Sequence, residues 1–174
     1  MLPQPDMPVA ALNEGENVAL LRHALLVEAP VEAVDRVVGD PLKWPSFWAG
    51  MTHMKHVSGD GDPGTTIEFI QKVMWMRLPL TAVTTEKNHN PDGSSAWRWR
   101  YEGAASGWLA FHHQPVGSQT RIVAEKEYES ASTAFGRAVD RLLVDRSQKR
   151  HLAACMENVK AMAEAAAVPK KTSA

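Results

Sequence analysis

The chain is poor in residues and patterns that mark several protein classes. Only one of its 174 residues is cysteine, Cys155, which excludes an internal disulfide and favours a reducing compartment. The 19 basic and 20 acidic residues give a net charge of −1, with no nucleic-acid footprint and no polybasic membrane patch. No apolar run approaches the roughly 20 residues of a membrane-spanning helix. We therefore expect a cytoplasmic protein without nucleic-acid partners or integral membrane association, and composition sets no expectation for its oligomeric state.

Common catalytic and metal-binding motifs are also missing. The sequence has no GxSxG, HExxH or P-loop motif, and the glycine-rich run 59–64 is read as a turn because no helix follows it. His53 and His56 are three residues apart in a predicted strand, so their side chains point to opposite faces and are poorly placed to share a metal. We expect no metal and no cofactor.

Tryptophan is abundant by contrast, with six residues against two tyrosines and four phenylalanines. A hydrophobic fraction of 44% and a charged fraction of 22% are ordinary for a globular protein, and the length favours one domain. We predict a single domain over residues 17–167, between a proline-interrupted arm (1–16) and a short tail (168–174).

Periodicity and turn signals predict one strand, two short helices, about six further strands and one long C-terminal helix. Short turns between the strands favour an antiparallel sheet. The long helix carries an apolar stripe that the concave face of such a sheet would bury. The predicted strands cover 18–28, 52–57, 65–73, 77–87, 96–102, 106–114 and 120–129, and the helices 30–38, 42–50 and 133–167.

This order, with the run APVEAV (29–34) followed by DPLKWPSFW (40–48), resembles the helix-grip proteins of the START, pollen-allergen and polyketide-cyclase superfamily (SRPBCC). The resemblance covers about residues 19–165. It implies an α+β helix-grip fold, with a curved sheet of about seven strands around the C-terminal helix. It also implies a cavity between sheet and helix, capped by the two short helices. Members of the superfamily bind lipids, sterols, polyketides or aromatic compounds, and some are enzymes.

Aromatic and sulfur-containing side chains are the candidates for the cavity wall. Trp97, Trp99 and Tyr101 alternate with Arg98, Arg100 and Glu102, so the aromatic side of this strand should face inward. A filled hydrophobic core explains the three aromatics nearly as well as a pocket wall does. The further apolar candidates, each also compatible with plain packing, are Trp44, Trp48, Met74, Met76, Trp108, Phe135, Val139 and Leu142.

Polar candidates are few. His112 and His113 are adjacent, so only one can face the cavity; parity does not decide which, and His112 is taken as a weak catalytic candidate. Lys126 and Tyr128 share parity with Ile122 and could meet a ligand carboxylate or hydroxyl at the cavity mouth. Arg146 falls on the apolar side of the long helix, where it would need Glu125, Glu127 or an anionic ligand as a partner.

Three functions are compatible with these features. The first is binding of a hydrophobic small molecule, lipid-like, polyketide or aromatic, in the cavity. The second is an enzyme of the polyketide cyclase/dehydratase type that uses the same cavity. The third is an interaction module whose cavity is closed by its own aromatic side chains.

Overall fold

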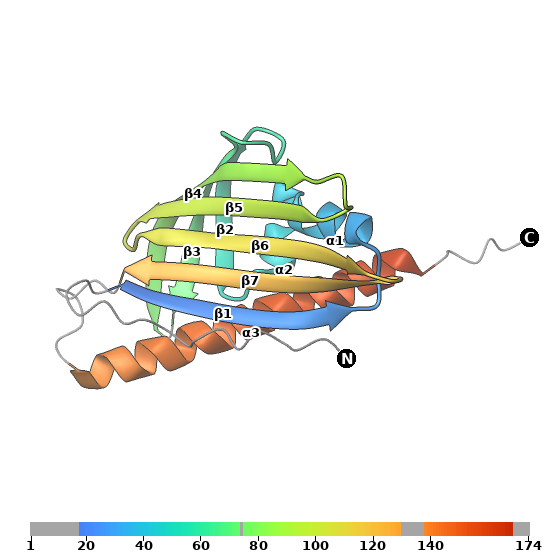
Figure 1. Cartoon of the computed structure of the whole chain (residues 1–174). Helices are drawn as coiled ribbons and strands as arrows, with labels where there is room; N and C mark the ends of the chain where they lie inside the picture. The colour runs from blue at the N-terminus through green and yellow to red at the C-terminus, as the bar shows by residue number, and fades with distance from the viewer. Residues whose placement is uncertain (1–17, 74, 130–137, 169–174) are drawn as a thin grey trace, which may run out of the picture.

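The computed structural model describes residues 18–73, 75–129 and 138–168. An antiparallel sheet of seven strands curls into a half-barrel, with three short helical segments at one side and a long C-terminal helix along it (Figure 1). The strands are β1 (Val18–Val27), β2 (Met51–Ser58), β3 (Thr66–Val73), β4 (Met76–His89), β5 (Ser95–Gly103), β6 (Gly107–Val116) and β7 (Gln119–Glu129). The helices are α1 (Val31–Val38), the 3-10 turn η1 (Pro41–Lys43), α2 (Trp44–Phe47) and α3 (Ala138–Ala167).

The strand order is β1-β7-β6-β5-β4-β3-β2, and every neighbouring pair is antiparallel. Strands β2 to β7 are sequential hairpins, whereas β1 crosses to the far edge and pairs with β7. The connection between β1 and β2 carries α1, η1 and α2, which therefore lie over the inner face of the sheet (Figure 1). The predicted helix-grip architecture is confirmed.

Local sequence accounts for the short helices. Pro30 occupies the N-cap of α1, where a missing N–H costs nothing, and Gly39 ends the helix. The side chain of Asp40 then accepts a hydrogen bond of 3.0 Å from the Leu42 backbone and caps η1. Trp44 and Phe47 are both buried, so the cap is fixed to the core.

Helix α3 buries one stripe against the sheet and the cap. The buried positions recur every three to four residues, as expected for one face of a helix: Leu152, Cys155, Met156, Val159 and Ala163. Polar contacts also hold α3, since Asn158 donates to the Phe47 carbonyl at 3.2 Å and Lys160 donates to the Leu26 carbonyl at 2.9 Å. The helix thus contacts both the cap and the edge strand β1.

Candidate functional site

A small pocket, the Lys126 pocket, lies between the inner face of the sheet, the end of α2 and α3. Its volume is about 10 Å³, which is room for roughly one water molecule. Side chains from the sheet, the cap and α3 meet there, so apolar and polar groups share its wall. The lining residues are Trp48, Ala49, Gln71, Leu109, Lys126, His151, Leu152 and Cys155.

Lys126 is the charged member of this pocket. It sits on the inner face of β7, opposite Leu109 on β6, and its Nζ donates to Gln148 Oε1 on α3 at 2.8 Å. The same Nζ lies 5.6 Å from the centre of the Tyr101 ring, a cation–π contact. Burial lowers the pKa of Lys126 to about 8. An amine with that pKa can both give and take a proton near neutral pH.

Two further titratable groups line the same pocket. Burial and then the charge of Lys126 lower the pKa of His151, so its imidazole is held neutral. Burial raises the pKa of the Cys155 thiol to about 12, which removes it as a nucleophile at neutral pH. The pocket therefore offers one cation and one neutral imidazole to a ligand, without a thiolate.

Gln71 supplies the remaining polar group. Its Nε2 donates to the carbonyls of Ala49, at 3.0 Å, and Lys72, at 3.2 Å, while its buried Oε1 has no hydrogen-bond partner among the described residues. Gly50 makes this possible, because a Cβ there would lie 2.4 Å from Gln71 Nε2 and its φ of +84° disfavours other residues. An unpaired buried acceptor costs about 1–3 kcal/mol. Gln71 is thus an acceptor that a ligand hydroxyl could satisfy.

The aromatic side chains of β5 pack mainly on one another. Trp99 is 1% exposed and has ring contacts with Trp97, Trp44 and Phe111 at centroid distances of 6.1, 4.9 and 5.7 Å. Tyr101 is also buried; its hydroxyl donates to the Glu127 carbonyl at 2.8 Å, and burial raises its pKa. Trp97, Trp99 and Tyr101 do not line the Lys126 pocket, and their contact with a ligand stays a prediction.

The sequence matches the family model for polyketide cyclase/dehydrase and lipid transport over residues 21–164. The chain belongs to this family. No protein of curated function matches the sequence significantly. Membership accounts for a curved sheet gripping one helix, and it fits a cavity for hydrophobic ligands between them.

Solved structures agree with the family fold at low identity. The protein TTHA0849 from Thermus thermophilus superimposes with a TM-score of 0.71 at 19% identity, covering 86% of this chain and 100% of that one. The Zhui aromatase/cyclase from Streptomyces sp. R1128 superimposes with a TM-score of 0.66 at 14% identity, covering 84% of this chain and 94% of that one. A point mutant of norcoclaurine synthase from Thalictrum flavum superimposes with a TM-score of 0.60 at 15% identity, covering 86% of this chain and 96% of that one. These likenesses establish the fold of this polyketide cyclase/dehydrase and lipid transport family member.

Some predicted site residues are placed on the inner face. Trp48 and Lys126 line the pocket, and Trp44 packs against Trp48 at 5.5 Å while its Nε1 donates to the Val38 carbonyl. Tyr128 is buried on β7 and its hydroxyl donates to Asp145 on α3. Met76 is half-buried at the start of β4. Met74 and Phe135 lie outside the described residues, as do the side chains of Val139 and Leu142 in α3.

The predicted placement of Trp108 and His112 at the cavity was wrong, because both residues lie on the outer face of the sheet. The register pairs Trp97 with Phe111 and Trp99 with Leu109, so the odd-numbered residues of β6 face inward. Trp108 instead stacks on the Arg98 guanidinium at 4.3 Å, and the His112 side chain is 46% exposed with its Nε2 3.8 Å from Glu125. His112 is therefore not a catalytic candidate for the cavity.

The prediction that Arg146 lies on the buried side of the long helix was also wrong. It is exposed on α3 and takes no part in an ion pair among the described residues. Glu125, one of the two glutamates expected as its partner, instead lies 3.4 Å from Arg22 on the neighbouring β1. The helix is rotated so that Leu152 and Met156, rather than Arg146, point into the core.

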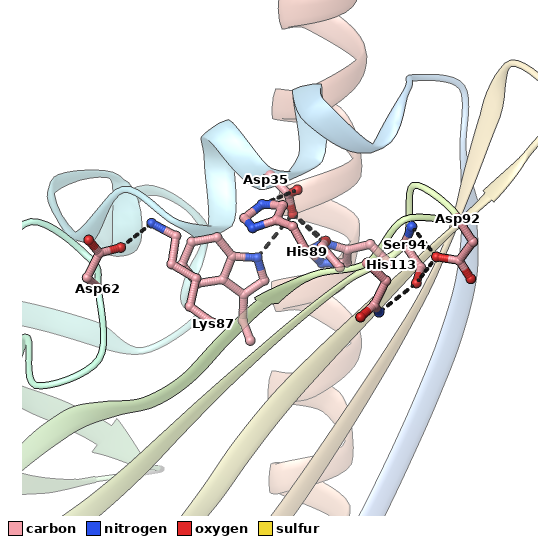
Figure 2. A network of polar contacts seen from close by, with 10 residues as sticks. Asp35, Asp62, Lys87, His89, Asp92, Ser94 and His113 are labelled. Carbon is pink, nitrogen blue, oxygen red and sulfur yellow. Dashed lines mark hydrogen bonds and ion pairs between the residues drawn. The ribbon is translucent and has the colours of Figure 1, made fainter.

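A second polar cluster, which we call the Asp35 cluster, joins α1 to the sheet and was missed in the sequence. Figure 2 shows Asp35 reaching from α1 toward His89 and His113. Asp35 Oδ1 accepts from Ser95 Oγ at 2.7 Å and Trp97 Nε1 at 3.0 Å, and lies 2.8 Å from His113 Nδ1. Its other oxygen is 3.2 Å from His89 Nε2. A carboxylate between Val31, Val34 and Val38 on a short helix was the signal that could have predicted a buried partner.

Electrostatics keeps the Asp35 cluster in one charge state. Burial lowers the pKa of His113 more than its hydrogen bond to Asp35 raises it, so the imidazole is neutral. Burial opposes ionisation of Asp35, but hydrogen bonds from His113, Ser95 and Trp97 leave the pKa of this carboxyl below its ordinary value. The neutral imidazole therefore donates from Nδ1 to the Asp35 carboxylate.

The Asp35 cluster has the residue types of a Ser-His-Asp triad without its geometry. A triad needs the serine on one imidazole nitrogen and the carboxylate on the other. Here Ser95 Oγ and Asp35 Oδ1 both approach Nδ1, at 3.0 and 2.8 Å, and the buried Nε2 has no partner in the described part of the chain. Among the described residues no three His, Cys, Asp or Glu side chains gather as metal ligands either. The cluster fastens the cap to the sheet.

Proposed function

We propose that this protein binds a hydrophobic small molecule, lipid-like, polyketide or aromatic, between the sheet and α3, with the polar end of the molecule at Lys126. The observation that carries the proposal is a desolvated lysine in an otherwise mainly apolar pocket, where it faces no carboxylate in the described ion pairs. Desolvation of the Lys126 ammonium costs folding free energy, so we infer that the residue has a role in binding. A ligand carboxylate, enol or hydroxyl would be its partner.

Ligand polarity follows from the lining groups. Lys126 donates and Gln71 Oε1 accepts, while Trp48, Leu109 and Leu152 present apolar surface. We therefore favour an amphipathic ligand with an acidic or hydroxylated end over a plain hydrocarbon. Because the described pocket holds about one water, binding must displace lining side chains such as Trp48 and Leu152.

The supporting experiment combines discovery with a matched variant. Native mass spectrometry of protein from its own host, followed by denaturation, would release and weigh a bound apolar molecule. Titration with an apolar fluorescent fatty acid would then compare the wild type with Lys126→Met and with Lys55→Met, an exposed lysine on β2. We expect Lys126→Met to weaken binding about tenfold, the effect of one charge-assisted contact, and Lys55→Met to match the wild type.

Two results would contradict the proposal. Equal fatty-acid binding by Lys126→Met and the wild type would remove Lys126 from the site. A protein that carries no molecule and binds no apolar probe would instead support the interaction module, whose interior is filled by residues such as Trp97 and Trp99.

We also propose a cytoplasmic location, which the free, buried thiol of Cys155 supports. Among the described residues, no helix has the length and apolar character of a membrane span.

The second candidate function is an enzyme of the polyketide cyclase/dehydratase type. The specific observation in its favour is the pKa of Lys126, about 8, beside the neutral imidazole of His151 in the same pocket. These two groups could move a proton to and from a carbonyl compound. Turnover of a released ligand, with a rate that rises through about pH 8 and is lost in Lys126→Met, would distinguish catalysis from carriage.

A further inference from the structure

The hairpin between β3 and β4 ends in the most exposed large apolar side chain of the described residues. The two strands pair as far as Val73 and Met76, so only Met74 and Trp75 connect them. Trp75 is 75% exposed. An exposed indole at the tip of a tight turn is available for a contact outside this chain, because its ring is apolar while its N–H can stay in water.

Two basic residues lie close to Trp75, in the second strand pair from the turn. Lys72 on β3 is paired with Arg77 on β4, and both side chains are exposed. Like charges in directly opposed positions on neighbouring strands repel each other. Neither joins an ion pair between described residues, and the hydrogen-bond partner of Arg77 Nη2 is another basic side chain, His53, at 3.3 Å. The hairpin thus gathers positive charge that no ion pair between described residues neutralises, and an external anion could do so.

The hairpin also adjoins the Lys126 pocket. Gln71 lines the pocket wall and immediately precedes Lys72, and its amide donates to the Lys72 carbonyl. Trp48 and Ala49, which line the same pocket, lie beside this strand end because Lys72 N donates to the Gly50 carbonyl at 2.7 Å. A surface that touched Trp75 would therefore lie next to the pocket.

We propose that the β3–β4 hairpin docks this protein on the surface of an anionic phospholipid membrane. Trp75 lies at the level of the headgroups, where an indole can keep its ring apolar and its N–H wet, and Lys72 and Arg77 contact lipid phosphates. One aromatic anchor and two charges make a reversible attachment rather than a permanent one. The inference does not depend on what the pocket binds.

The test is sedimentation of the full chain with vesicles at low salt. Vesicles of phosphatidylcholine alone are compared with vesicles of phosphatidylcholine and phosphatidylglycerol in equal parts. We expect binding to the anionic vesicles only, weakened roughly tenfold by Trp75→Ala through loss of apolar contact. The double variant Lys72→Gln/Arg77→Gln should lose about fivefold for each charge removed.

Leu42→Ala is the matched control. Leu42 is 70% exposed, but it lies in η1, whose Pro41 packs near Gly61 in the β2–β3 turn, at the other end of β3. It should bind anionic vesicles like the wild type. All three changes are at exposed positions, so thermal melts should be unaltered. Fatty-acid titration without vesicles should also be unaltered, which separates docking from the function proposed for the pocket.

Three outcomes would overturn the docking proposal. One is equal vesicle binding by Trp75→Ala and the wild type. Another is an equal loss in Leu42→Ala, which would indicate nonspecific adsorption of exposed apolar side chains. The third is self-association, measured by analytical ultracentrifugation without lipid, that Trp75→Ala abolishes; Trp75 would then be an interface between copies of this chain.

Discussion

The Asp35 cluster and the Lys126 pocket are two polar groups of residues on the inner side of one sheet, and their energetics are opposite. Asp35 receives hydrogen bonds from Ser95 and Trp97 and lies within hydrogen-bonding distance of His113. Within the described part of the chain, Lys126 Nζ has one hydrogen bond, to Gln148, and burial lowers the pKa of this amine to about 8. The first arrangement lowers the energy of the ionised form, and the second raises it.

This difference distinguishes Asp35, which stabilises the fold, from Lys126, for which we propose a role in binding. A buried charge whose hydrogen bonds are satisfied rigidifies the structure around it. A buried charge that is poorly satisfied costs folding free energy, and such costs are characteristic of residues kept for binding or catalysis. The contacts of Asp35 fasten the cap, whereas ligand recognition by Lys126 is our proposal, and substitutions on either side test the comparison.

The largest effect is expected for Trp99→Ala, which tests the closed part of the interior. Trp99 is 1% exposed among Trp44, Trp97 and Phe111, so truncation should destabilise the fold by about 3–5 kcal/mol. Urea denaturation measures the loss, with Trp75→Ala as a control expected to lie within about 0.5 kcal/mol of the wild type. A folded Trp99→Ala of near-normal stability that binds a fatty acid poorly would make Trp99 a pocket wall.

The second effect concerns the Asp35 cluster. Asp35→Ala leaves the buried donors of Ser95, Trp97 and His113 without their acceptor, and we expect a loss of about 2–4 kcal/mol. Fatty-acid binding by the folded fraction should persist. Asp62→Ala, which removes an exposed partner of Lys87, is the control and should change the unfolding free energy little.

The same cluster predicts acid sensitivity. His113 and Asp35 both have folded-state pKa values below their ordinary values of 6.5 and 3.8, so the unfolded chain binds more protons. Stability should fall as the pH drops below about 6.5 through His113, and further below about 3.8 through Asp35. A flat stability profile between about pH 7 and pH 5 would show that His113 is not held neutral.

Lys126→Met tests the other side of the comparison and should stabilise the protein. Removing a desolvated ammonium is expected to raise the unfolding free energy at pH 7 by about 1–3 kcal/mol, after the loss of the Gln148 hydrogen bond. The folded pKa of about 8 lies below the ordinary 10.5, so wild-type stability should rise between these pH values. The advantage of the variant should therefore shrink from pH 8 to pH 10.5. A variant less stable than the wild type at neutral pH would mean that Lys126 is a structural residue.

Much of the architecture was predictable from the sequence because its signals are local. Alternation placed β5 within one residue at each end, and turn-forming runs such as 58–64 and 88–94 separated the strands. The Trp97, Trp99 and Tyr101 face was correctly placed inside, because arginines and a glutamate occupy the other face.

The site was less predictable because it depends on register and on contacts between distant residues. On β6 both alternate sets contain an aromatic residue and a histidine, so only pairing with Trp97 and Trp99 shows that His113 faces in. In the Asp35 cluster, Asp35 is 60 positions from Ser95 and 78 from His113, and no local pattern reveals such contacts. Similarly, Lys72 and Arg77 form no run of charge in the sequence and become neighbours only through the hairpin.

The smallest effect, and the sharpest check on register, is expected for the pair of adjacent histidines on β6. His112 is exposed beside Glu125, so His112→Ala should change the unfolding free energy by less than about 0.5 kcal/mol and leave fatty-acid binding intact. His113→Ala, one residue away, removes a buried ring from the Asp35 cluster and should cost several times more. Urea denaturation of the two variants measures the contrast. Equal losses would mean that β6 does not hold this register, and a loss of ligand binding in His112→Ala alone would return that histidine to the cavity.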